Sequence, residues 1–281
     1  MRIIGRFIFA TVFLFTSFSS LAWNALGHRL IGQIAYNHLN SAVKIRVDSY
    51  NQALEPVYHQ HTFANAGPWM DTLRYVSDVW MKPFHYIDNP FSVDGTPLIQ
   101  PEEPNAVTAI TNAEVVLHDP KSTDFNKGFS ERILLHVIGD LHQPLHAVSQ
   151  FSQAHPEGDR GGNLFYLGSN AVASNLHAYW DNGGGFLMTK GEVDDEGLRL
   201  MAKNIEEKWP CDLSAMSNDP TAWSLESFQI AVDKTYSIKP YQKPDQNYQA
   251  MVQDMVQQRI ALAGCRLAKV LNDGVPKGLS T

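Results

Sequence analysis

The feature that most constrains this chain is the segment Leu135–His146, which reads LHVIGDLHQPLH. It contains three potential metal ligands, His136, Asp140 and His146. Residues four apart on a helix point the same way, so the side chains of His136 and Asp140 can close on one ion. Pro144 interrupts the helical hydrogen bonds and redirects the chain, which lets His146 serve a neighbouring site.

A second pair with the same spacing, His177 and Asp181, follows in the segment NLHAYWD. One His-x3-Asp pair carries little weight, because exposed helices contain such pairs by chance. Two pairs in a chain with only 11 histidines indicate a metal centre.

The first residues, 1–22, read as a secretory signal peptide. Arg2 and Arg6 supply the positive start, and an apolar run and a small-residue cleavage site follow. The apolar run is too short to span a bilayer as a mature helix, although an N-terminal membrane anchor is the alternative. Cleavage before Trp23 predicts a secreted or periplasmic chain, 23–281, that has no stable membrane association.

The composition limits what this mature chain binds. The formal net charge is −7, and removing Arg2 and Arg6 makes it more negative. Such a chain is not built to hold duplex DNA by a basic surface and counterion release. Bound cations must supply the positive charge if it acts on nucleic acid, which favours a multi-metal enzyme over a plain binding module.

Helical periodicity dominates the sequence, and strand signals are few. The predicted helices cover Ala25–Leu39, Pro104–Leu117, Ser130–Asp140, Asp194–Glu207, Ser224–Thr235 and Gln246–Asn272. Loops rich in proline and glycine cover Asn89–Pro104 and His155–Gly162, and one short strand is predicted at Asn163–Leu167. The chain is long enough for one large domain or two tightly joined ones, and we predict a mostly α fold with long functional loops.

The only two cysteines, Cys211 and Cys265, lie in the last third of the chain. No second thiol lies near either one, so neither resembles a metal ligand. In an oxidising compartment we expect them to form a disulfide.

Four further residues attract attention as ligands: Trp23, His28, Asp71 and His85. Each has an ordinary explanation, for instance Asp71 as an ion-pair partner of Arg74. Together with the two pairs and His146, however, they bring the set to five histidines and three aspartates without a thiolate. Imidazole and carboxylate suit catalytic zinc, and eight such side chains exceed the needs of one tetrahedral ion. Two or three ions are therefore implied.

The motifs resemble those of the secreted zinc-dependent single-strand-specific nucleases and 3′-nucleotidases, of the fungal and mung bean kind. This family shares a superfamily with the bacterial zinc phospholipases C. The matching motifs are an N-terminal Trp followed five residues later by His, Trp-x-Asp-x-x-Arg, His-Tyr-Ile-Asp, His-x3-Asp-x-His-Gln-Pro-x-His, Gly-Gly-Asn and Leu-His-x3-Asp. They extend from Trp23 to Asp181, and no motif is recognised after that.

The resemblance implies a single helical domain with long loops around a cleft that holds three zinc ions. The first ion is expected at Asp71, His85, His136 and Asp140, and the second at His146, His177 and Asp181. The third is expected at His28, Asp140 and Trp23, whose α-amino group is freed by cleavage and binds together with the backbone carbonyl.

The resemblance also implies a reaction and a substrate. Single-stranded DNA and RNA, and 3′-nucleotides, are expected to be hydrolysed, with 5′-phosphate ends on the nucleic acid products; no protein partner is predicted. Asp71 is expected to orient the attacking water, and Arg74 to neutralise charge on the phosphoryl oxygens. Tyr86 is the expected stacking platform for a base, with core packing as its alternative role. Asp88 and Asn163 are expected to hydrogen-bond the base edge.

Two other functions remain open at this point. A zinc phospholipase C is the nearest enzyme, but such enzymes carry Glu where Asp181 stands, and this chain has no amphipathic, Trp-rich loop for a lipid surface. A non-enzymatic periplasmic zinc-binding protein is the second, although its ligands would lie in flexible stretches rather than in separate segments. The remaining histidines are expected on the surface or in loops, except His142, which is expected to support the ligands.

Overall fold

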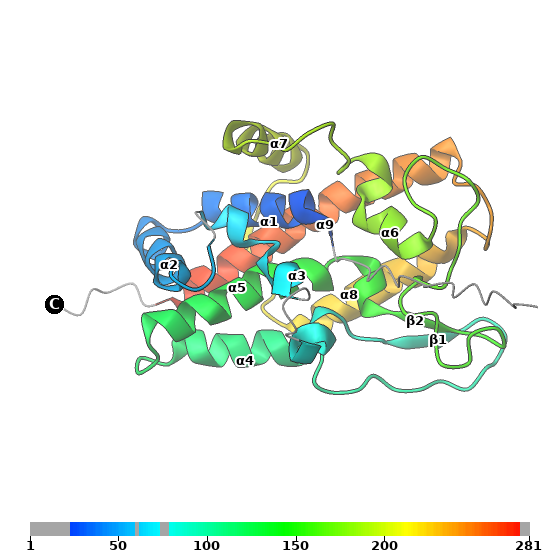
Figure 1. Cartoon of the computed structure of the whole chain (residues 1–281), viewed down its shortest axis with the longest axis horizontal. Coiled ribbons are helices and arrows are strands. Elements are labelled where there is room, and N and C mark those ends of the chain that lie inside the picture. The colour runs from blue at the N-terminus through cyan, green and yellow to red at the C-terminus, as the bar shows by residue number, and fades with distance from the viewer. Residues whose placement is uncertain (1–22, 60–61, 74–78, 276–281) are drawn as a thin grey trace, which may run out of the picture.

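Helices account for most of the residues that the structure describes (Figure 1). This computed structural model describes residues 23–59, 62–73 and 79–275, so the predicted signal peptide and Arg74 lie outside the described residues. The elements are α1 (Ala25–Asn37), α2 (Ser41–Leu54), α3 (Trp69–Thr72), β1 (Pro90–Ser92), α4 (Ala106–His118), α5 (Asp124–Leu141), β2 (Ser149–Phe151), α6 (Leu176–Asp181), α7 (Asp195–Lys208), α8 (Pro220–Asp233) and α9 (Gln246–Gly274). The predicted mostly α class is confirmed.

The core forms where α5 packs against α2, α4 and α9, while α9 packs against α1 (Figure 1). The apolar stripe predicted on α1 faces this core, with Leu30, Ile31 and Ile34 fully buried. Gly264 lets α9 approach α1 closely, because an added Cβ there would lie 2.6 Å from a methyl group of Ile34. The last helix of the described residues thus packs against the first.

All six predicted helices are present, but several of their boundaries differ from those expected. The helix predicted from Ser130 begins at Asp124, because the side chain of Thr123 caps it by accepting from the amide of Asn126. The helix predicted from Ser224 likewise begins at Pro220. Helix α2 was not predicted; its buried residues Val43, Val47, Tyr50, Asn51 and Leu54 lie against α5.

The predicted strand at Asn163–Leu167 was wrong. Only Tyr166 forms an isolated bridge there, with Asn175. The strands are instead β1 and β2, which pair in parallel, with Pro90 opposite Ser149. They are too short to show an alternating pattern in the sequence.

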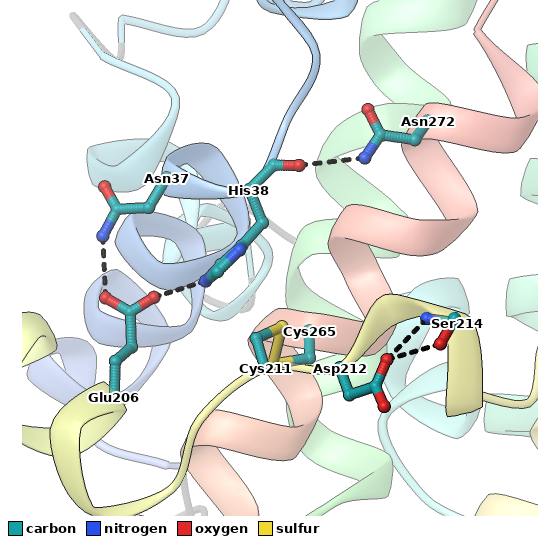
Figure 2. The surroundings of a disulfide bond; sticks show 8 residues. All are labelled: Asn37, His38, Glu206, Cys211, Asp212, Ser214, Cys265 and Asn272. Carbon is teal, nitrogen blue, oxygen red and sulfur yellow. Dashed lines mark hydrogen bonds and ion pairs between the residues drawn. A yellow bond between two sulfur atoms is a disulfide. The ribbon is translucent and has the colours of Figure 1, made fainter.

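The expected disulfide is confirmed: Cys211, in the loop after α7, bonds Cys265 on α9, with their Cα atoms 5.7 Å apart. Nearby, Glu206 of α7 accepts hydrogen bonds from Asn37 and His38 at the end of α1 (Figure 2). The disulfide and this contact both attach α7 and its following loop to the α1–α9 core.

None of the helices in the described part of the chain is long and apolar enough to cross a membrane.

Candidate metal centre

The metal centre is organised around the last turns of α5. His136 and Asp140 face each other as their spacing predicts, with His136 Nε2 3.2 Å from Asp140 Oδ2. Both side chains are fully buried. A polar pair this deep in a helix that packs on three others requires partners, and residues from distant segments supply them.

A first group of ligand atoms joins α3, the 3-10 helix Val79–His85 and α5. The facing nitrogens His136 Nε2 and His85 Nδ1 are 3.0 Å apart, and Asp71 Oδ1 lies 3.6 Å from the former and 3.8 Å from the latter. His85 Nδ1 is also 2.9 Å from Asp140 Oδ2. Atoms this close can all bind one cation.

A second group is formed by His146, which follows Pro144 in the 3-10 turn Pro144–Ala147, and by the pair on α6. The Nε2 atoms of His146 and His177 are 3.0 Å apart. Asp181 places one carboxylate oxygen 3.6 Å from His177 Nε2 and the other 4.0 Å from His146 Nε2. Gln143 donates to that second oxygen of Asp181 and orients the carboxylate.

A third group lies on the other side of Asp140. His28 Nε2 is 3.3 Å from Asp140 Oδ1, whereas Oδ2 faces the first group. The His28 ring stacks on that of His136 with centroids 4.0 Å apart. Trp23 is fully buried beside them and donates from its indole to the carbonyl of Gly139. Asp140 therefore lies between two potential ion sites.

Backbone carbonyls orient three of the imidazoles. His136, His146 and His177 each place Nδ1 2.6–2.8 Å from a main-chain oxygen, that of Gly67, His85 and Gly161 respectively. Nδ1 then carries the proton, and the lone pair of Nε2 faces the group of ligands. Gly161 adopts a φ of +60°, and an added Cβ would lie 2.2 Å from the oxygen of Leu145, so only glycine fits there.

The electrostatics also suit a bound cation. Burial lowers the pKa of His28 and His85, which keeps both imidazoles neutral. Burial alone would raise the pKa of Asp140, but His136 and the other histidines outweigh it and hold that pKa well below its usual range. Nε2 of His28 and Oδ1 of Asp140, which face each other, are buried without a hydrogen-bond partner, a cost that a bound metal ion removes. Nitrogen and oxygen donors without thiolate fit zinc.

The C-terminal helices support this centre, although no sequence motif marked them. Arg259 on α9 donates to the carbonyl of His142 and to Ser227, whose hydroxyl donates to the carbonyl of Leu141. Arg266 donates to His142 Nε2. His142 thus points toward α9, in keeping with its expected supporting role. Ser227 and Arg259 thus satisfy the carbonyls of Leu141 and His142 at the C-terminal end of α5, directly after Asp140.

The residues expected to bind substrate lie in the loops beside the centre. Tyr86 and Asp88 follow His85 and are partly buried. Burial, with further contributions from Asp159 and Glu102, raises the pKa of Asp88 to about 6. The side-chain amide of Asn163 donates to the carbonyl of Arg160, in the loop whose Gly161 orients His177. The roles expected for these three residues stay predictions.

An open hollow of about 750 Å³ lies beside the third group. Its wall includes Asn24, Pro68 and Asn182, which neighbour Trp23, Gly67 and Asp181 in the chain. The grouped His and Asp side chains do not themselves line this hollow.

Known proteins are similar to this chain in sequence. The sequence profile of the S1/P1 nuclease family matches residues 23–275. The chain is 28% identical to Endonuclease 1 of Arabidopsis thaliana over 89% of its own length and 86% of the relative's. It is 24% identical to Nuclease P1 of Penicillium citrinum over 89% and 97%, and 27% identical to Nuclease S1 of Aspergillus oryzae over 57% and 53%. With a match that starts at the buried tryptophan of the metal centre and runs to the end of α9, the chain belongs to the S1/P1 nuclease family.

Proposed function

We propose that this nuclease is a secreted or periplasmic phosphodiesterase with three zinc ions. In this proposal it hydrolyses single-stranded DNA and RNA to products with 5′-phosphate ends and also removes phosphate from 3′-nucleotides. The observation that carries the proposal is the adjacency of three buried His/Asp groups, two of which meet at His136 and Asp140. Such proximity suits ions that act together on one phosphate.

The ligand sets follow the three groups. Asp71, His85, His136 and Asp140 hold the first ion, and His146, His177 and Asp181 hold the second. His28, Asp140 and the main chain of Trp23 hold the third, which requires cleavage before Trp23 to free its amine. The burial of Trp23 and its hydrogen bond to Gly139 support this position for the new terminus. The mature domain is then 23–281.

Bound zinc supplies an activated water near neutral pH and stabilises the charge on the leaving oxygen. The protein side chains position the reactants. Asp71 accepts a hydrogen bond from the attacking water and aligns it with the phosphorus, opposite the 3′-oxygen. Arg74 pairs with phosphoryl oxygens as charge builds on them.

The preference for single strands follows from the buried position of the ligands. A phosphate reaches such a site only on a splayed backbone, whose unstacked base then lies on Tyr86. Asp88 and Asn163 bind the edge of that base. Opening a duplex costs several kcal/mol, so paired strands are poor substrates.

The test uses the processed protein, starting at Trp23, incubated with single-stranded DNA with and without a chelator. Chelator-sensitive cleavage with 5′-phosphate ends supports the proposal. Zinc-loaded protein that cleaves neither single-stranded DNA nor RNA would refute the substrate class. Products with 3′-phosphate ends would refute the proposal that water attacks the phosphorus opposite the 3′-oxygen.

A further inference from the structure

Two tyrosines form an exposed aromatic pair outside the metal centre. The side chains of Tyr166 and Tyr241 are 47% and 74% exposed, and their rings stack with centroids 6.3 Å apart and planes 17° from parallel. Large aromatic side chains usually bury their area, so a stacked pair on the surface is a candidate binding feature.

The backbone conformation that holds this pair in place is strained. Tyr241 has a φ of +60°, in the left-handed region that favours glycine and asparagine. Its amide donates to the carbonyl of Tyr166 at 2.7 Å, and the amide of Gly168 donates to the carbonyl of Gln242. A bulky residue in strained backbone indicates a function for the ring, since glycine or asparagine would fit with less strain.

The pair is attached to the second ligand group. Tyr166 bridges Asn175, whose side chain caps α6 two residues before His177. The loop that carries Tyr166 also contains Gly161, which orients the His177 ring. At the right of Figure 1, the loop before α6 and the loop between α8 and α9 lie side by side, as the Tyr166–Tyr241 hydrogen bond requires. The pair of tyrosines therefore lies a short distance from the second ligand group of the metal centre.

The surrounding charge favours a polyanion. Lys239 and Lys243 are exposed on either side of Tyr241, in a chain whose net charge is −7. The nearest following acid, Asp245, caps α9 by accepting from the amide of Tyr248. Stacked aromatic rings flanked by lysines suit bases joined by phosphates.

We propose that Tyr166 and Tyr241 form a stacking platform for nucleotides of a single strand beyond those held at the cleaved phosphate. This inference rests on the proposed function. The rings accept any base, so the platform increases affinity for longer strands without adding sequence preference.

The test compares the KM for a dinucleotide with that for a strand of about 12 nucleotides, the upper range of such binding sites. Tyr241→Asn removes the ring and relieves the positive φ, Tyr241→Phe retains the ring, and Tyr166→Ala removes the partner. Phe125→Ala is the control, because Phe125 is 40% exposed on the first turn of α5, at the opposite end from Asp140. Unchanged zinc content and thermal unfolding of each variant show that it is folded.

For Tyr241→Asn and Tyr166→Ala we expect a KM for the long strand about tenfold higher, with the dinucleotide KM within about twofold of wild type. Tyr241→Phe and Phe125→Ala should match wild type. An unchanged KM for the long strand, or an equal rise in KM for both substrates, would refute the stacking platform and leave the proposed function intact. Failure of the wild-type protein to cleave either strand would overturn the proposed substrate class, and the platform with it.

Discussion

His146 places Nδ1 2.7 Å from the main-chain oxygen of His85, so a residue of the second ligand group fixes the backbone of the first. The amide of Ile87 donates back to the carbonyl of His146, and the parallel pair β1 and β2 continues the contact. The short sheet therefore helps to hold the two groups of candidate ligands in register.

Replacing Asp140 should remove more bound zinc ions than replacing Asp181 does. Its two oxygens face different ligand groups, whereas both oxygens of Asp181 face the same two histidines. Starting from about three zinc ions per chain, we expect Asp140→Asn to leave about one and Asp181→Asn about two. Metal analysis of the dialysed proteins measures this, and equal losses would contradict the bridging position of Asp140.

Arg266 should stabilise the metal centre from α9. It donates to His142 Nε2 and to both oxygens of Glu226. Arg266→Met should cost about 2 kcal/mol of stability and speed zinc loss to a chelator, because charge-assisted hydrogen bonds are removed next to the end of α5. Lys269→Met, on the same helix but in an exposed pair with Asp273, is the matched control and should cost less than about 0.5 kcal/mol. Denaturant unfolding and zinc release give the two readouts, and similar values for both variants would refute the role of Arg266.

Glu131 should make stability depend on pH. Burial raises the pKa of this carboxyl well above its usual range, and Oε2 has no hydrogen-bond partner. The folded chain holds the proton more tightly than the unfolded chain does, so this contribution to stability is complete below the unfolded pKa. It is lost as the pH rises through the folded pKa. Glu131→Gln should therefore lose less stability than wild type between about pH 5 and about pH 8.

Thermal unfolding across this pH range measures the Glu131 effect. The difference between wild type and variant isolates it from the histidines of the metal centre, which both proteins share. Glu157→Gln, at an exposed position, controls for the loss of one negative charge. Parallel pH curves for wild type and Glu131→Gln would contradict the prediction.

The disulfide should stabilise the chain by closing a long loop. Cys211 and Cys265 are 54 residues apart, which corresponds to about 4 kcal/mol of chain entropy removed from the unfolded state. The double variant Cys211→Ser/Cys265→Ser should unfold at lower denaturant concentration than wild type. Reducing agent should destabilise wild type and leave the variant unchanged; sensitivity of the variant would point to another cause.

Prediction from the sequence was most accurate where the spacing of two residues along a helix determines their relative positions in space. His136 and Asp140, or His177 and Asp181, are one helical turn apart, so their facing side chains could be predicted without knowing the fold. The apolar stripe of α1 was predictable for the same reason. Convergence of Asp71 and His28 on α5 depends on the packing of distant segments, and only the family resemblance suggested it.

Other features could not be read from the sequence because they depend on backbone groups or on isolated side chains. The carbonyls of Gly67 and Gly161 orient ligands, yet every residue has a carbonyl. Arg259 and Arg266 resemble ordinary surface arginines of a long helix until α9 is seen to be buried. The strand predicted at Asn163–Leu167 was wrong because Asn163 and Leu164 lie in a turn and only Tyr166 pairs, in an isolated bridge with Asn175.

The packing of α9 on α1 has a consequence for biosynthesis. Every proposed metal ligand has been translated once synthesis passes Asp181, but the helix that covers α1 and braces the end of α5 is translated later. A growing chain therefore exposes the apolar face of α1 until α9 has been synthesised. Products of premature termination will carry the full ligand set and still lack the wall that holds it, so they should be cleared as misfolded protein rather than act as nucleases.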